Sequence, residues 1–260
     1  MPVRSFSSFA VLTLLLALVL LAVAPANALP VRADPAPDDV RAEMSQHWTD
    51  LGGAAGPLGE PAGEPFAITG GYRWDFAGGS LFRADPPEGQ SATVSAVLGT
   101  TLQRYDEYGG PAGPLGYPKG DPAALANGAS AQEFGHGNIY TSRATGAHEV
   151  VGAILGRYLT QGGPARLGLP TTGETDVPGV TGARQNIFQR GRIYWSPRTG
   201  AHEVLGAILG RYLTQGGPTR LGLPTTGETD VPGVTGARQN IFQRGRIYWS
   251  PRTGAHEVLG

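Results

Sequence analysis

A histidine followed by a glutamate recurs three times in the second half of the chain, and these pairs are the first candidates for chemistry. They are His148-Glu149, His202-Glu203 and His256-Glu257. No second histidine follows one helical turn later, so the His-Glu-x-x-His pattern of catalytic zinc is missing. We expect no metal and no cofactor. The glutamates favour a helix N-terminus here, and a ligand-binding role for the histidines stays open.

Carboxylates form a second recurring set. One follows each of four Leu-Gly-x-Pro segments. Glycoside hydrolysis needs two carboxylates facing each other across a cleft, whereas these come once per repeat. No Gly-x-Ser-x-Gly segment indicates a serine hydrolase. The sequence therefore predicts no enzyme, and the carboxylates are interpreted as caps of a chain corner or as sugar contacts. They are Glu64, Asp121, Glu174 and Glu228.

Two segments, 169–173 and 223–227, match the sortase signal Leu-Pro-x-Thr-Gly. Such a signal is expected once, near the C-terminus, before an apolar tail and basic residues. Here it occurs twice inside the repeats, and a motif outside its context is weak support for a function. We interpret both segments as parts of the repeat.

The remaining recurring residues suit carbohydrate, because sugar rings stack on aromatic faces and their hydroxyls bind planar polar groups. Tryptophan is seldom fully buried, so each tryptophan is as compatible with the core as with a binding surface. The earlier repeats are degenerate, with Thr141 in place of tryptophan. The candidate carbohydrate-binding residues are Trp195, Trp249, Arg198, Arg252, His148, His202, Glu174 and Glu228.

Internal repetition indicates which elements position these side chains. Residues 147–200 and 201–254 differ at only two positions, a period of 54 residues. We predict a helix over 201–214, a stop at a Gly-Gly pair, a Leu-Gly-x-Pro corner, and a hairpin of strands 239–243 and 246–249. An aromatic residue four positions before each stop is expected to pack in the core. These aromatic residues are Trp48, Tyr105, Tyr158 and Tyr212.

One such unit cannot bury its apolar face alone, so neighbouring units must stack. The predicted fold class is an α+β repeat of stacked helix–corner–short hairpin units, arranged as a propeller-like ring or a compact array, over residues 38–260. Residues 255–260 repeat the beginning of the predicted helix and then stop. We therefore expect the last unit to be truncated, with ring closure by the segment 40–51 as the alternative.

Composition narrows the classes of partner. The chain has no cysteine and a net charge of −1, which favours neither a disulfide framework nor binding to nucleic acid. Arg4, the apolar stretch 11–23 and the Ala-Asn-Ala of 26–28 predict a signal peptide over residues 1–28. An uncleaved membrane anchor is the alternative. Residues 29–37, rich in proline, are predicted to be a flexible linker.

The four Leu-Gly-x-Pro corners, the Gly-Gly stops and the segment 193–202 resemble the LGFP repeat family of secreted, wall-associated proteins of actinobacteria. The third corner residue departs from that pattern, being Glu, Tyr or Leu and never Phe. The resemblance implies a secreted, wall-associated protein that binds arabinogalactan or peptidoglycan without catalysis and, once the signal is cleaved, without a membrane. The binding part of a wall amidase or mycolyltransferase, and a self-stacking structural protein, are the alternatives. The oligomeric state stays open.

Overall fold

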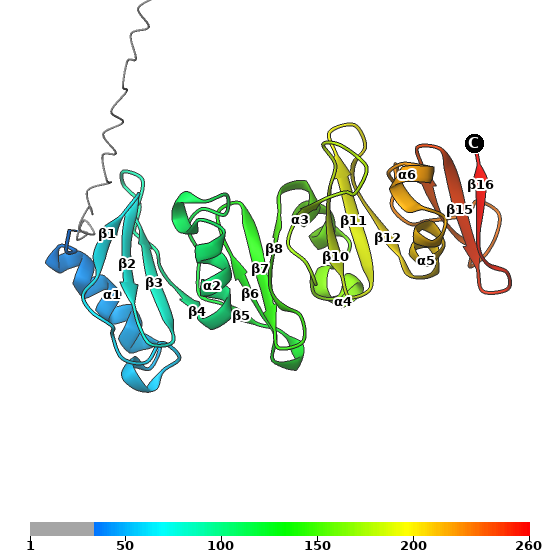
Figure 1. Cartoon of the computed structure of the whole chain (residues 1–260). Coiled ribbons are helices and arrows are strands. Elements are labelled where there is room, and N and C mark those ends of the chain that lie inside the picture. Colours follow the sequence, from blue (N-terminus) through cyan, green and yellow to red (C-terminus); the bar gives the residue numbers. More distant parts are fainter. Residues whose placement is uncertain (1–33) are drawn as a thin grey trace, which may run out of the picture. The chain divides into compact units, whose positions relative to one another are not determined.

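The structure is a computed structural model that describes residues 34–260 (Figure 1), so the predicted signal peptide lies outside the described residues. Residues 34–37, assigned above to a flexible linker, belong to the first repeat. Pro35 forms an isolated bridge with Phe66, and Ala36 is buried in the first core. Within 34–260, no helix combines the length and hydropathy needed to cross a membrane.

The described chain forms four units, each a helix followed by a four-stranded antiparallel sheet whose strands pair in sequence order (Figure 1). We call them unit 1 (34–98), unit 2 (99–151), unit 3 (152–205) and unit 4 (206–259). Units 1 and 2 contain α1 (Asp38–Asp50), β1 (Phe66–Ile68), β2 (Gly71–Asp75), β3 (Gly79–Ala84), β4 (Val94–Leu98), α2 (Gly99–Glu107), β5 (Ala123–Ala124), β6 (Ser130–Glu133), β7 (Gly137–Ser142) and β8 (Gly146–Val151), with short 3-10 turns at Gly53–Ala55, Gly110–Ala112 and Ala126–Gly128.

Units 3 and 4 have the same order, with a second short helix in place of the 3-10 turn after the first one. Their sequences differ at one position, Ala165 against Thr219. Unit 3 contains α3 (Gly152–Thr160), α4 (Gly163–Leu167), β9 (Thr175–Asp176), β10 (Arg184–Phe188), β11 (Gly191–Ser196) and β12 (Gly200–Leu205); unit 4 contains α5 (Gly206–Thr214), α6 (Gly217–Leu221), β13 (Thr229–Asp230), β14 (Arg238–Phe242), β15 (Gly245–Ser250) and β16 (Gly254–Leu259).

The predicted helix over 201–214 is half right. Residues 206–214 form α5, which buries Ile208 and Tyr212 one turn apart and is followed by Gly216 in the left-handed region (φ 90°). The preceding segment, 200–205, is the strand β12 instead. Its side chains alternate between the two faces of the sheet, and a sequence this short fits a period of two as well as a helical period. The interpretation of His202 and Glu203 as a helix N-terminus is therefore wrong.

The predicted hairpin is confirmed, since β14 and β15 pair with each other in antiparallel register. The sequence missed the strands on either side of it, β13 and β16. Residues 254–259, expected to be the beginning of a further helix, form β16, the fourth strand of the last sheet. The incomplete helix on which the expectation of a truncated last unit rested is a strand, and the expectation itself stays a prediction.

Each helical tyrosine packs between two sheets, as expected for a core residue. Tyr212 stacks on Phe242 of its own unit, with ring centroids 4.4 Å apart. It also meets Tyr194 of the preceding unit edge-on, with centroids 5.7 Å apart. Tyr158 and Tyr105 repeat this arrangement in the preceding units. Burial raises the pKa of Tyr212 well above its ordinary value.

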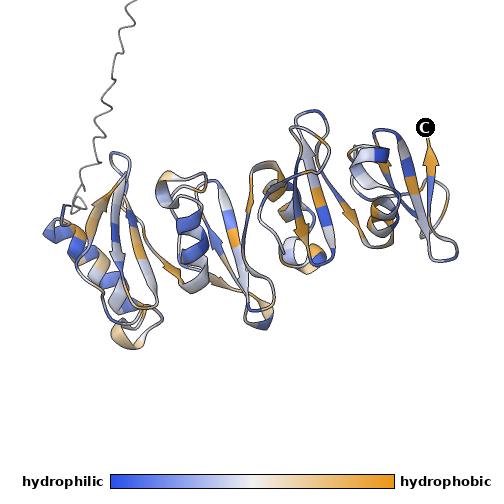
Figure 2. Cartoon of the chain, in the orientation of Figure 1, coloured by the Kyte–Doolittle hydropathy of each residue, from blue (hydrophilic) through white to orange (hydrophobic). Residues whose placement is uncertain are grey.

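Neighbouring units therefore share one apolar core, as stacking of repeats requires. The helix α5 contacts β15 and β16 on one side and β11 and β12 of unit 3 on the other. In units 1, 2 and 3 the next-to-last residue of the fourth strand is a fully buried valine, namely Val97, Val150 or Val204. Figure 2 shows the apolar ends of these strands. The predicted repeat of helices and small sheets is confirmed. The propeller-like ring is not, because the element contacts that define the packing join consecutive units.

Candidate functional site

The Leu-Gly-x-Pro corner is a structural element in every unit. Its glycine has a positive φ, 75° at Gly222, a region that favours glycine. The carbonyl of this glycine accepts a hydrogen bond from the helical aromatic residue about ten positions before it; in unit 4 the Tyr212 hydroxyl donates over 2.6 Å. Trp48, Tyr105 and Tyr158 donate in the same way in the other units. The aromatic residue and the corner are thus tied together, which the sequence spacing did not reveal.

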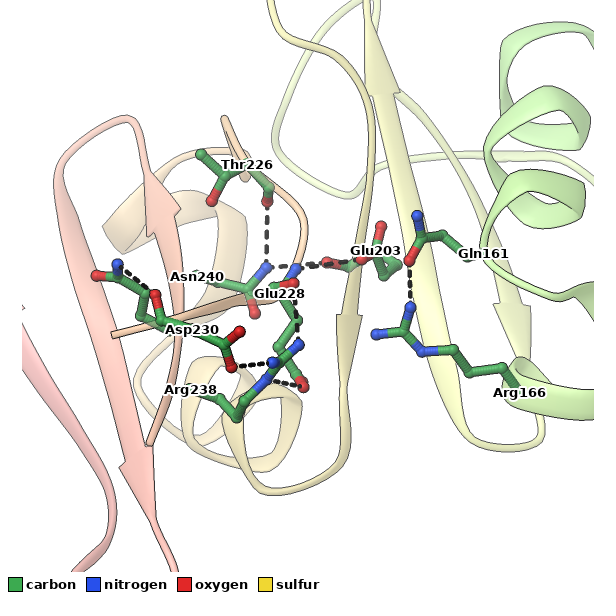
Figure 3. A network of polar contacts seen from close by, with 9 residues as sticks. Gln161, Arg166, Glu203, Thr226, Glu228, Asp230, Arg238 and Asn240 are labelled. Carbon is green, nitrogen blue, oxygen red and sulfur yellow. Dashed lines mark hydrogen bonds and ion pairs between the residues drawn. The ribbon is translucent and has the colours of Figure 1, made fainter. Parts of the chain in front are cut away.

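A buried glutamate lies where unit 2 meets unit 3 and where unit 3 meets unit 4, and Figure 3 shows the second of these, Glu203, beside Glu228 and Asn240 of unit 4. Glu203, at 0 % exposure in β12, accepts a hydrogen bond from Nε of Arg157 in α3 over 2.6 Å. Its other carboxylate oxygen accepts the backbone N–H of Glu228 in unit 4 over 3.1 Å, and its carbonyl accepts Nδ2 of Asn240. A buried carboxylate needs such compensation. Glu149 and Arg104 form the same bridge between units 2 and 3.

This bridge explains the glycine of the sortase-like segments. A Cβ added to Gly227 would lie 2.1 Å from the Arg157 guanidinium and 2.5 Å from the Glu203 carboxylate. A Cβ added to Gly173 would likewise clash with the Glu149 carboxylate and the Arg104 guanidinium. The threonine before each glycine binds strand backbone, as when Oγ1 of Thr226 accepts the N–H of Ile241. In the structure each Leu-Pro-Thr-Thr-Gly segment fits over the bridge of the preceding unit, which supports the interpretation that it is part of the repeat.

A carboxylate also joins units 1 and 2, but different residues supply and bind it. Ala96 stands where Glu149 and Glu203 stand in the later units, so its strand offers no carboxylate. Asp121 of unit 2 supplies one instead. Its Oδ1 accepts the backbone N–H of Ala96 over 2.7 Å and contacts Nε2 of His47 in α1 at 2.9 Å. The carboxylate of this corner is therefore part of the packing between units 1 and 2.

The repeated histidines close strand turns. His202 Nε2 donates to the carbonyl of Thr199 over 2.8 Å, and His148 does the same to Thr145 over 2.7 Å. Both side chains are half-buried and belong to the fourth strand, beside the turn that joins it to the third. Arg198 and Arg252 are exposed in the corresponding turns of units 3 and 4. The structure gives the histidines a turn-closing contact and leaves the arginines available to solvent.

Trp249 and Glu228 do come together, around a hollow of about 210 Å³ in unit 4. The start of α5, from Gly206 to Ile208, forms another wall. Arg238, which the sequence analysis did not single out, lies opposite Trp249 in the β14–β15 register and lines the same hollow. The tryptophan is half-buried and packs partly against the core. It is therefore neither a free surface ring nor a core residue.

The arginine of this hollow is held by carboxylates. Nε of Arg238 donates to Glu228 over 3.0 Å, and NH1 of the same side chain binds Asp230. Burial lowers the pKa of Arg238, but these hydrogen bonds more than offset it, so the pKa is raised. Arg184 is bound in the same way by Glu174 and Asp176 in unit 3, opposite Trp195. Glu174 and Glu228 therefore orient an arginine beside a tryptophan.

Unit 2 keeps the hollow and lacks its large side chains. Ser130 and Thr141 occupy the paired strand positions of Arg238 and Trp249. The hollow there measures about 510 Å³ and is also bounded by the helix start Gly99–Thr101. In unit 1 the two residue types exchange strands, with Tyr72 opposite Arg83 and the guanidinium 5.8 Å from the ring centre. The sequence therefore held a signal for these residues. The paired strand positions of Arg238 and Trp249 carry an arginine with an aromatic residue in some units and two small polar residues in unit 2.

No three His, Asp or Glu side chains among residues 34–260 are grouped to hold a metal ion. A family model described as the LGFP repeat matches residues 115–165, 167–219 and 221–260. Each match begins at or next to a Leu-Gly-x-Pro corner, so the family's repeat covers the sheet of one unit and, in the first two matches, the helix of the next. A comparison with curated proteins found no match.

Proposed function

The chain belongs to the LGFP repeat family, whose repeats occur in cell-surface proteins, and from this and the hollows beside the sheets we propose that it binds cell-wall polysaccharide without catalysis. The observation that carries the proposal is the hollow of unit 4, where a half-buried indole lies opposite an arginine fixed by two carboxylates. An aromatic face beside oriented planar donors matches the C–H faces and hydroxyls of a sugar ring. Secretion and attachment to the wall are parts of the same proposal.

Repetition strengthens weak binding. A similar hollow is present in unit 2, and the Trp195–Arg184 pair repeats its unit 4 counterpart in unit 3. Several sites on one chain raise the effective concentration of each site for a polymer that is already bound at another. A repeating polysaccharide such as arabinogalactan or the glycan of peptidoglycan is the partner that uses this property.

Co-sedimentation of the mature chain, residues 29–260, with protein-free actinobacterial walls tests the proposal. We expect the chain to pellet with the walls and to release no soluble fragments. Trp249→Ala should weaken binding about fivefold, the loss of one stacking contact of roughly 1 kcal/mol. Leu159→Ala, which removes an exposed apolar side chain outside the hollows (51 % exposed), is the matched control and should bind normally.

Other outcomes separate the alternatives. Release of soluble wall fragments would show that the chain is an enzyme. Assembly of the chain with itself, without retention on walls, would support a structural role. A gain of function adds a sharper test. The double variant Ser130→Arg and Thr141→Trp installs the unit 4 pair in unit 2, and it should bind walls more tightly than the unaltered chain.

A further inference from the structure

A separate cavity lies between units 3 and 4, on the face of the unit 3 sheet that turns away from its own helix. We call it the unit 3/4 cleft. Its volume is about 260 Å³. Polar side chains of β10 and β11 form one wall, and the end of α5 with the following Gly-Gly-Pro forms the other. The residues that the argument uses are Gln185, Arg192, Tyr194, Leu213 and Pro218.

Two buried polar atoms in this cleft have no hydrogen-bond partner among residues 34–260. They are the hydroxyl of Tyr194 and Oε1 of Gln185, whose residues are 1 % and 5 % exposed. Buried polar atoms in folded proteins nearly always have a partner, because an unpaired one destabilises the fold. Two unpaired atoms that line one cavity point to a ligand that carries the complementary groups.

A cation completes the set. Arg192 lies two residues before Tyr194 on β11, so both side chains are on the same face of the sheet and both line the cleft. Burial raises the pKa of the Tyr194 phenol, and the Arg192 guanidinium partly offsets this rise. The two side chains do not reach normal hydrogen-bond geometry, since the hydroxyl stays unpaired. The cleft thus presents a guanidinium donor, an amide acceptor and a hydroxyl that both donates and accepts.

At the other two junctions, the residues at the equivalent positions have partners within the chain. Between units 2 and 3, Ala131 replaces Gln185, and Nδ2 of Asn138 donates to the Tyr140 hydroxyl over 3.3 Å. Between units 1 and 2, Arg73 binds Asp106 of the next helix over 2.8 Å and lies over the ring of Phe82. Oε1 of Gln239, the counterpart of Gln185 in unit 4, is also unpaired, but Tyr248 beside it is only half-buried, so within residues 34–260 the pair of unpaired atoms occurs at the junction of units 3 and 4.

We propose that the unit 3/4 cleft binds one neutral sugar ring, a proposal that rests on the proposed function and assigns it a second kind of site. The volume is smaller than that of pockets for drug-sized ligands and suits a single ring. An anion carries only acceptors and would leave Oε1 of Gln185 unpaired, whereas a sugar hydroxyl donates to it. Leu213, 37 % exposed, and Pro218 offer apolar contacts to the C–H face.

Saturation-transfer NMR on the mature chain tests this proposal with arabinose, galactose and N-acetylglucosamine as probes and sulfate as the anionic competitor. We expect at least one sugar to bind and sulfate not to displace it. Tyr194→Phe removes only the hydroxyl and should weaken that binding about three- to tenfold. Tyr248→Phe makes the same change at the equivalent position of unit 4 and should leave sugar binding unchanged.

Stability measured in parallel separates a ligand role from a structural one. The Tyr194 hydroxyl has no partner within residues 34–260, so Tyr194→Phe should leave the melting temperature unchanged or raise it. Unchanged sugar binding in Tyr194→Phe, equal loss in Tyr248→Phe, or displacement by sulfate would each overturn the proposal. If the chain still pellets with walls in those cases, the proposed function stands and only this site is lost. If it neither pellets nor binds a sugar, both fail.

Discussion

Units 3 and 4 differ at one residue, yet the same side chains have different surroundings in the two. The helix α5 covers the face of β11 and β12 that points away from their own helix, whereas no helix within residues 34–260 covers the corresponding outer face of β15 and β16. Val204 is accordingly 0 % exposed and its counterpart Val258 is 55 % exposed. Tyr194 is buried, while Tyr248 is half-buried. The comparison teaches that the outer face of each sheet becomes core only through the helix of another unit.

The ion pair shows the same dependence. Glu203 is held by Arg157 and by the backbone of Glu228, which belongs to the next unit. Glu257 pairs with Arg220 of its own unit instead, and its second oxygen has no partner among the described residues. The matched positions of units 3 and 4 therefore allow each contribution of a neighbour to be measured by difference, with the sequence of the unit held almost constant.

The largest difference is expected for the tyrosines. Tyr194→Ala removes a buried ring that packs against Tyr212 and should lower the free energy of unfolding by roughly 3–5 kcal/mol. Tyr248→Ala removes a half-buried ring and should cost about 1 kcal/mol. Chemical denaturation of the two variants measures both. Equal losses would contradict the view that the next helix creates this core.

A smaller difference is expected for the carboxylates. Glu203→Gln leaves Arg157 without its charged partner, at a cost of about 2 kcal/mol, below the range for a fully buried pair because Arg157 is 27 % exposed. Glu257→Gln affects a pair whose arginine is 43 % exposed and should cost less than about 0.5 kcal/mol. Urea midpoints of the two variants, compared at constant m-value, give the result. The view of Glu203 as an inter-unit bridge fails if the two midpoints coincide.

The valines are expected to differ less again. Val204→Ala removes two buried methyl groups, worth about 1.5 kcal/mol. Val258→Ala removes groups that are already more than half exposed and should change stability by less than about 0.5 kcal/mol. Thermal unfolding of both variants beside the unaltered chain provides the comparison. A loss at Val258 as large as at Val204 would mean that another surface covers β16 in solution.

The sequence predicted the repeat, its corner, its hairpin and the buried aromatic residue, because each has a strong local signature. It failed at 200–205, where five or six residues cannot distinguish a helical period from a strand period. It also missed the two-residue strands β9 and β13, which have no side-chain pattern of their own. Strand pairing with a neighbour in space decides both cases.

The candidate site was only partly predicted, again because contacts between segments that are distant in the sequence determine its composition. Trp249 and Glu228 were found from residue type and recurrence, and the structure places both at one hollow. Arg238, which binds Glu228 and lies opposite Trp249, was missed because its exchange with aromatic and small polar residues in the other units is visible only once the strand register is known. The histidines were placed on a helix that does not exist there, so their turn contacts with Thr145 and Thr199 could not be foreseen.

The smallest difference between units 3 and 4 is expected for the tryptophans, whose two alanine variants should lose nearly the same stability. Trp195 and Trp249 each lie beside the helix of their own unit. Trp195 packs against the cluster that contains Ile154 of α3, and Trp249 lines the hollow with the start of α5. Their surroundings are therefore the same although their units have different neighbours. Trp195→Ala and Trp249→Ala should each lower the free energy of unfolding by about 1–2 kcal/mol, less than a fully buried aromatic residue, and should agree within about 0.5 kcal/mol. Denaturation curves for the two single variants, with the tyrosine pair measured alongside as a positive control for a neighbour effect, decide the matter. A loss at Trp195 that matches the loss at Tyr194, with Trp249 unaffected, would mean that the tryptophan belongs to the packing between units and not to a hollow within each unit.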